Sequence, residues 1–254
     1  MQTVTFKNRF EEELRGTLHL PETQNGLGFV LGHCFTCSRH TRVLIDLSNT
    51  LAGLGLSVLR FDFSGNGQSQ GRFEDSTYTK QIGEMTAAVA FMKQRGAEQV
   101  LIGGHSMGAM VSLFTASETG DIAGVIALAT GAAPMHPDRV LTPSQKQQLQ
   151  VAGQVPFSSR GRDLTLNRAF FEDAGQYRLE EAIARIRCPV LLVLASEDAV
   201  TDPQPVKTLL ADRPPLMDLL EVPGADHMFS SQESRKKVMD HVSQWILNHF
   251  SGGA

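Results

Sequence analysis

A serine lies between two glycines in the run Gly104-His105-Ser106-Met107-Gly108. An apolar stretch, 99–103, precedes this run, and a helix-compatible stretch, 109–117, follows it. A G-x-S-x-G sequence between a strand and a helix is typical of a sharp turn that presents a nucleophilic serine at the head of a sheet. The turn also places the Met107 N–H at a helix N-terminus, where it is free to bind developing negative charge. We therefore predict Ser106 as nucleophile and Met107 as one oxyanion-hole donor.

A serine hydroxyl is a poor nucleophile until a base takes its proton, and an acid must orient that base. Asp198 follows the apolar stretch 189–194, and His227 follows the stretch 216–222. If both stretches are strands of one sheet, both side chains project toward the edge that carries Ser106. The sequence predicts a triad of Ser106, Asp198 and His227.

Other carboxylates and histidines compete for these roles. Glu197 and Asp202 flank Asp198 and stay open as alternative acids. His105 directly precedes the serine and is expected to pack beneath the turn. Four more histidines are expected at the surface of a hairpin, an insertion and the last helix: His19, His136, His241 and His249. His227 is left as the predicted base.

The second oxyanion donor is expected in the loop after the apolar stretch 28–32. Phe35 is the predicted donor, and Cys34 replaces it if the turn is shifted by one residue. Cys34 and Cys37 also form a C-x-x-C sequence between a predicted strand and a helix, flanked by histidines. This spacing keeps a redox pair or half of a metal site open as competing interpretations, although no second Cys/His pair at suitable spacing follows.

The glycine-rich loop 64–71 resembles a phosphate cradle at first sight. It lacks a following G-K-[ST], and its glycines are not spaced as G-x-G-x-x-G. We predict a rim of the site rather than a nucleotide-binding loop.

Composition indicates a globular enzyme of one large domain, 1–254, since 41% of the 254 residues are hydrophobic and 20% are charged. A net charge of −4 argues against nucleic acid as a partner. No cofactor or metal is predicted, a small-molecule ester is the expected partner, and the oligomeric state is not predicted.

The N-terminus shows no basic segment followed by an apolar segment and a cleavage site, and no apolar stretch is long enough to span a bilayer. A cytoplasmic location is therefore expected. Three cysteines are an odd number and predict no disulfide framework, which fits a reducing compartment.

Alternating and continuous apolar patterns predict an α/β fold with a mainly parallel sheet. An antiparallel hairpin is expected at 3–7 and 16–20. Further strands are expected at 28–32, 56–63, 99–103, 122–129, 189–194 and 216–222, and helices at 42–54, 78–94, 109–117, 206–210 and 233–250. Ligands bind beyond the carboxyl ends of the strands in such sheets, where His33, Ser64, Ser106 and Asp198 are expected.

One insertion, 134–180, interrupts the alternation of strands and helices and shows no clear buried strand. It is too long for an ordinary connection and is interpreted as a small cap over the site. Its aromatic and basic residues favour a modest acyl or aryl ester with an anionic end as substrate. These residues are Phe157, Phe170, Phe171, Arg160, Arg162 and Arg168.

The runs 32–39 and 59–69, together with the G-x-S-x-G sequence, resemble the α/β-hydrolase superfamily, in particular small acyl-ester hydrolases of the serine aminopeptidase-like, cinnamoyl-esterase-like and lysophospholipase-like groups. They look most like the hydrolase half of bacterial proteins that fuse this domain to an OsmC-type peroxidase domain, although no such second domain is expected here. Cys34 departs from the usual His-Gly-Phe. The resemblance implies a Ser106, Asp198 and His227 triad with Phe35 and Met107 as oxyanion donors.

These observations lead to the hypothesis of a cofactor-independent serine hydrolase acting on short to medium acyl or aryl carboxylic esters. Two alternatives come from other classes. One is a non-catalytic ligand-binding module on the same fold, and the other is thiol redox chemistry at Cys34 and Cys37.

Overall fold

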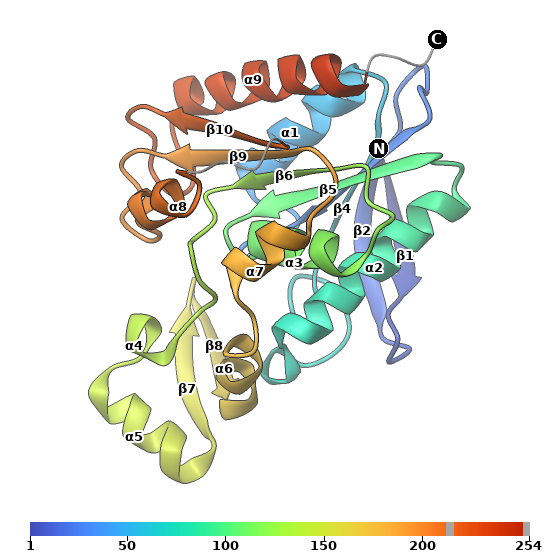
Figure 1. Cartoon of the computed structure of the whole chain (residues 1–254). Coiled ribbons are helices and arrows are strands. Elements are labelled where there is room, and N and C mark those ends of the chain that lie inside the picture. The colour runs from blue at the N-terminus through green and yellow to red at the C-terminus, as the bar shows by residue number, and fades with distance from the viewer. Residues whose placement is uncertain (212–215, 251–254) are drawn as a thin grey trace.

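An eight-stranded sheet forms the centre of the protein in a computed structural model that describes residues 1–211 and 216–250 (Figure 1). The strand order is β1-β2-β4-β3-β5-β6-β9-β10. The strands are β1 (Gln2–Lys7), β2 (Glu13–His19), β3 (Leu27–Gly32), β4 (Ser57–Phe61), β5 (Gln99–His105), β6 (Gly124–Leu128), β9 (Val190–Ala195) and β10 (Met217–Val222). β2 pairs antiparallel with β1 and β4, whereas all other neighbours are parallel. The predicted α/β architecture with an antiparallel N-terminal hairpin is confirmed.

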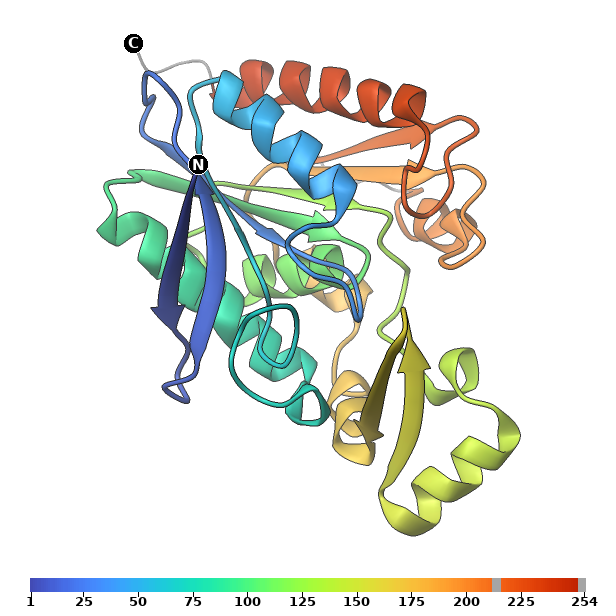
Figure 2. The same ribbon diagram turned by 180° about the vertical axis from the view of Figure 1, so that it is seen from behind.

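Helices cover both faces of the sheet (Figures 1 and 2). One face carries α1 (Arg42–Gly53) and α9 (Gln232–Phe250), and the other carries α2 (Tyr78–Gln94), α3 (Met107–Glu118) and α7 (Leu179–Arg185). β3, β6 and β9 are buried along their whole length, because helices pack on both sides of them. The continuous apolar runs of these strands follow from that double coverage.

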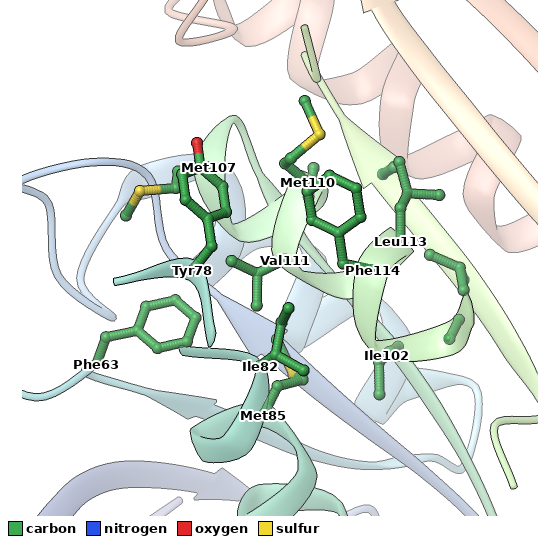
Figure 3. Packing of buried hydrophobic residues seen from close by; sticks show 14 of the residues in the cluster. Phe63, Tyr78, Ile82, Met85, Ile102, Met107, Met110, Val111, Leu113 and Phe114 are labelled. Atoms are coloured by element: carbon green, nitrogen blue, oxygen red, sulfur yellow. The ribbon is translucent and has the colours of Figure 1, made fainter. Parts of the chain in front are cut away.

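α3 begins directly after Ser106 and is held by a dense apolar cluster (Figure 3). Figure 3 shows α3 side chains packed against α2 side chains above the sheet. The cluster includes Phe63, Tyr78, Ile82, Met85, Ile102, Met107, Met110, Val111, Leu113 and Phe114. This close packing against α2 and the sheet fixes the N-terminus of α3, which directly follows Ser106.

α8 (Pro203–Leu209) begins earlier than the expected 206, because Asp202 caps it. The Asp202 carboxylate accepts a hydrogen bond from the Gln204 amide at 2.9 Å, and Pro203 fills the first helical position. A short 3₁₀ helix, η1 (Phe73–Asp75), precedes α2.

The cap segment, residues 134–180, lies beyond the carboxyl ends of the parallel strands (Figures 1 and 2). Besides the start of α7, it contains α4 (Pro137–Val140), α5 (Pro143–Ala152), β7 (Gln154–Ser159), β8 (Arg162–Asn167) and α6 (Arg168–Ala174). β7 and β8 form an antiparallel hairpin separate from the main sheet, and the sequence pattern did not predict it. The hairpin is half-exposed and contains Pro156, so it carries no buried-strand pattern.

His19 contradicts the expectation of a surface histidine, since it is buried. β2 is an interior strand between β1 and β4, and Arg60 of β4 lies against the His19 ring. Burial and the neighbouring Arg60 charge lower the pKa of His19 to about 4. The other three histidines, His136, His241 and His249, are exposed as expected.

None of the helices in the described ranges has the length and apolar character needed to cross a membrane.

Candidate active site

Ser106 occupies a left-handed backbone conformation between β5 and α3, with φ of 56° and ψ of −113°. A non-glycine residue adopts this conformation only at a cost, which the surrounding contacts must offset. Gly104 and Gly108 pass so close to β3 that a Cβ on either would overlap the carbonyl oxygen of Gly32. The glycines at both ends of the G-x-S-x-G sequence are therefore required by the close approach of backbone to backbone.

Asp198 and His227 meet beyond the ends of β9 and β10. His227 Nδ1 lies 2.7 Å from Asp198 Oδ2. The other carboxylate oxygen accepts hydrogen bonds from the amides of Val200 and Thr201 at 2.8 and 2.7 Å, and the Thr201 hydroxyl donates to Oδ2 at 2.8 Å. Burial opposes the charge of Asp198, but the hydrogen bonds from His227 and Thr201 outweigh it and lower the pKa of Asp198. The carboxylate is thus ionised and fixed against the imidazole.

The competing acids have other positions. Glu197 is exposed, and Asp202 is occupied as the N-cap of α8. The structure therefore brings Asp198, and neither flanking carboxylate, into hydrogen-bond contact with His227.

His105 packs behind His227, as expected, with the ring centroids 4.9 Å apart. Its Nε2 lies 2.6 Å from the His227 backbone oxygen. Burial and the neighbouring His227 lower the pKa of His105 to about 4, so the ring is neutral at pH 7 and Nε2 donates its proton to that carbonyl. His105 thereby links the serine turn to the loop that carries His227.

His33 fixes the direction of the Phe35 amide. The Phe63 amide donates to His33 Nε2 at 3.1 Å, so the proton of this buried ring lies on Nδ1, which donates to the Cys34 carbonyl at 2.8 Å. The C=O and N–H of a trans peptide point in opposite directions. The Phe35 N–H of the same peptide plane therefore points away from His33, and Phe35 lines the cavity described below.

Cys34 and Cys37 form a disulfide, with Cα atoms 5.2 Å apart. The expectation of no disulfide framework is wrong for this pair, which the C-x-x-C spacing had left open as a redox pair, whereas Cys188 is free and buried. The amide of Cys37 donates to the Cys34 carbonyl at 3.0 Å, so the loop turns tightly enough to bring the two sulfurs together. An odd cysteine count could not reveal this local pairing.

The glycine-rich loop 64–71 wraps around a buried carboxylate. Asp62 forms an ion pair with the Arg39 guanidinium and accepts from the Arg39 and Gln68 amides at 2.7 and 3.0 Å. A Cβ on Gly67 would overlap this carboxylate. The loop therefore donates a backbone hydrogen bond to the Asp62 carboxylate of the protein itself. Gly67 also lines a cleft beside the site, in keeping with the predicted rim.

A cavity of about 310 Å³ opens over Ser106 and His227. Phe35 and Met107 line it, and its more apolar part is formed by Tyr78, Met110, Met135 and Val140. In the described part of the chain, His227 bonds through Nδ1 and carries no hydrogen bond on Nε2, the ring nitrogen that remains for Ser106. Hydrogen bonds between catalytic groups often tighten only when substrate binds.

No three His, Cys, Asp or Glu side chains gather as metal ligands do within residues 1–211 and 216–250. In particular, the loop around Cys34 shows no such cluster.

A model of the Alpha/beta hydrolase family matches residues 25–240. The chain belongs to this family. The match supports a hydrolase, and no functionally curated protein matches the sequence significantly.

Solved structures of two esterases and of one further alpha/beta hydrolase domain-containing protein share the fold of this hydrolase. Est1E from Butyrivibrio proteoclasticus, with ferulic acid bound, is 20% identical with a TM-score of 0.82, over 98% of this chain and 99% of that chain. The esterase domain of a Rhodothermus marinus protein is 25% identical with a TM-score of 0.77, over 98% of both chains. Mouse alpha/beta hydrolase domain-containing protein 10 is 18% identical with a TM-score of 0.79, over 98% of this chain and 99% of that chain.

Proposed function

We propose that this protein hydrolyses carboxylic esters through a triad of Ser106, His227 and Asp198. The observation that carries the proposal is that Ser106, in its strained turn, and the Asp198-bound His227 line one cavity. Two esterases among the structures with the same fold support the reaction class. The branch of the family and the OsmC-fusion resemblance stay predictions, as does the cytoplasmic location.

In the proposed reaction, His227 Nε2 takes the Ser106 proton as the hydroxyl oxygen attacks the ester carbonyl. The Phe35 and Met107 amides donate to the resulting oxyanion. His227 then protonates the leaving alcohol, and a water molecule, activated by the same imidazole, releases the acid and restores the serine. Asp198 stabilises the imidazolium and keeps the proton of the neutral ring on Nδ1. Every step of the proposed reaction uses side chains and amides of this chain and a water molecule, so the proposed reaction needs no cofactor.

Short to medium acyl or aryl esters are the proposed substrates. A cavity of about 310 Å³ matches the lower end of small-molecule sites. We propose that the cap segment, as part of a single domain 1–254, closes the cavity, because its residues Met135, Val140 and Arg160 line the cavity together with Ser106.

Hydrolysis of 4-nitrophenyl butyrate by Ser106→Ala tests the proposal. We expect kcat to fall on the order of 10⁵-fold, because a triad without its nucleophile retains only oxyanion and binding effects. Ser117→Ala, on the same helix, is the matched control, since its hydroxyl donates to the Phe114 carbonyl and does not line the cavity. Ser106→Ala turnover equal to that of this control would refute the triad.

A second candidate function, thiol–disulfide exchange, is favoured by the Cys34–Cys37 disulfide, because Cys34 lines the catalytic cavity and Cys37 the adjoining cleft. In that reaction, a thiol donor reduces the disulfide to two thiols and is itself oxidised to a disulfide. Turnover of a disulfide or peroxide that Cys34→Ser abolishes, and that Ser106→Ala leaves intact, would establish it. Absence of such turnover in the wild-type protein would rule out thiol–disulfide exchange as a function.

A further inference from the structure

A second cleft, of about 500 Å³, adjoins the catalytic cavity. Thr36, Arg160 and Met228 line both. Met228 directly follows His227, the residue that would protonate the leaving alcohol in the proposed reaction. The cleft therefore adjoins the part of the cavity next to His227, where the proposed reaction releases the alcohol.

The cleft has a positive lining in a chain whose net charge is −4. Arg42, Arg160 and Arg162 line it, and no described Asp or Glu does. Arg42 pairs with Asp46 at 3.0 Å. Within the described ranges, no carboxylate forms an ion pair with Arg160 or Arg162, whose hydrogen-bond partners are uncharged.

The partners of these two guanidinium groups are uncharged acceptors. Arg160 Nη2 lies 3.6 Å from the Met228 sulfur. Arg162 donates to the Gly65 carbonyl at 3.1 Å and reaches the Asn66 side-chain oxygen at 3.4 Å. Because a guanidinium has five N–H donors, both groups retain donors for a ligand.

Arg168, the third arginine singled out from the sequence, has a different role. Its Nη2 donates to the Leu149 and Gln150 carbonyls at 3.1 and 2.6 Å, at the end of α5, and Arg168 lines neither the cavity nor the cleft. Its contribution is to satisfy helix carbonyls that would otherwise lack partners.

The β7–β8 hairpin places Arg160 where the catalytic cavity and the second cleft meet. Arg160 and Gly161 form the two-residue turn between β7 and β8, with φ of 52° and 73°. Asn and Gly suit such a turn, whereas an arginine there is strained. The preceding Ser159 hydroxyl lies 2.8 Å from that of Thr36, which ties the turn to the loop of the Phe35 amide. An unfavourable residue is thus held at the edge of the proposed site.

We infer that the substrate carries an anionic group, a carboxylate or a phosphate, on its alcohol portion, and that Arg160 and Arg162 bind this group in the cleft. The inference rests on the proposed esterase function. The acyl portion lies in the apolar part of the cavity, and the anion lies beside His227, where both guanidinium groups form charge-assisted hydrogen bonds to it.

Two esters that differ in one charge test this selection: 4-(butanoyloxy)benzoate and its neutral counterpart 4-(butanoyloxy)benzamide. The measured quantity is the ratio of kcat/KM for the carboxylate to kcat/KM for the amide. Comparing variants by this ratio cancels the intrinsic difference between the two leaving groups. A third ester, 4-(butanoyloxy)phenyl phosphate, tests phosphate in the same position.

Arg160→Asn removes the charge and supplies a residue that the turn favours. We expect the ratio to fall about tenfold, as for the loss of one partly screened charge-assisted hydrogen bond, while Tm stays the same or rises. Arg162→Asn should also lower the ratio. Arg178→Asn is the matched control, because Arg178 is exposed, bonds to the Gly175 and Tyr177 carbonyls, and lines neither space.

A ratio in Arg160→Asn equal to that in Arg178→Asn, for the carboxylate and phosphate esters alike, overturns the inference. If the wild-type protein cleaves no ester, the proposed function fails, and calorimetric titration with 4-hydroxybenzoate and 4-hydroxybenzamide tests the cleft by itself. Tighter binding of the carboxylate that Arg160→Asn abolishes then supports the anion site, and equal affinities overturn it.

Discussion

The carboxyl edge of the sheet and the tip of the β7–β8 hairpin both line the same cavity but are built differently. At the edge, Gly104 and Gly108 approach Gly32 so closely that no side chain fits, and this close contact between backbones helps to set the position of Ser106. The hairpin is half-exposed, and its tip is held by the Thr36 to Ser159 contact and by Arg162.

This difference assigns different tasks to the two regions. Atoms that must meet within a few tenths of an ångström belong on rigid elements, whereas residues that select a substrate tolerate more freedom. We therefore expect changes at the sheet edge to affect whether the reaction occurs, and changes in the cap segment to affect which ester is used or how stable the cap is.

Asp198→Asn is expected to have a large effect on turnover. The amide leaves the geometry nearly intact but no longer stabilises the imidazolium or its Nδ1–H tautomer, so kcat should fall on the order of 10⁴-fold. Steady-state kinetics on 4-nitrophenyl butyrate measure it. Asp202→Asn is the matched control, because Asn caps a helix as well as Asp does. Equal rates for the two variants would remove Asp198 from the proposed triad.

Gly108→Ala tests the backbone contact at the sheet edge. The new Cβ must displace the end of β3, which also carries the loop of Phe35, so kcat/KM should fall about 100-fold and Tm should decrease. Gly120→Ala is the control, since no atom lies within 4 Å of a Cβ built there. An active, stable Gly108→Ala enzyme would contradict the claim that the close approach sets the serine position.

The pH dependence of stability tests the buried His105 beneath the edge. Its pKa of about 4 in the folded protein lies below the ordinary 6.5, so the unfolded state binds the proton more readily between these values. The free energy of unfolding should therefore fall as the pH is lowered from 6.5 toward 4, by on the order of 3 kcal/mol from this residue. Denaturant titrations should give a shallower pH dependence for His105→Gln, whose amide keeps a donor for the His227 carbonyl. An unchanged pH dependence in His105→Gln would argue against a buried neutral histidine.

Arg168→Ala should have the smallest catalytic effect. Loss of the bonds to the α5 carbonyls should lower stability by about 1 kcal/mol, while kcat/KM on 4-nitrophenyl butyrate changes less than about twofold. Thermal unfolding and steady-state kinetics measure both effects. A large loss of turnover would show that the cap segment takes part in the chemistry and would break the division between the two regions.

The sequence predicted those parts of the structure whose pattern is local and repeated. α1 and α2 were expected at 42–54 and 78–94 and occur at Arg42–Gly53 and Tyr78–Gln94, because their periodic apolar residues face a buried sheet. The placement of Ser106 between strand and helix followed from Gly104 and Gly108 in the same way.

The parts that could not be predicted depend on tertiary contacts. The Asp62 and Arg39 pair joins two loops distant in sequence, and the burial of His19 depends on contact with Arg60 of the neighbouring strand β4. The β7–β8 turn was missed because an arginine occupies a position where Asn or Gly gives the usual signal. The arginine that hid this turn from sequence analysis is Arg160, the residue that we propose binds the substrate anion.

Covalent labelling with a fluorophosphonate probe is the decisive measurement for an activated Ser106, because the probe phosphonylates activated serine hydroxyls far faster than ordinary ones. Mass spectrometry of the labelled protein should show one stoichiometric adduct on Ser106, with no adduct in Ser106→Ala and a rate of labelling reduced by orders of magnitude in His227→Ala. A wild-type protein that forms no adduct, or forms it on a different residue, would contradict an activated Ser106 and favour a ligand-binding module on the same fold.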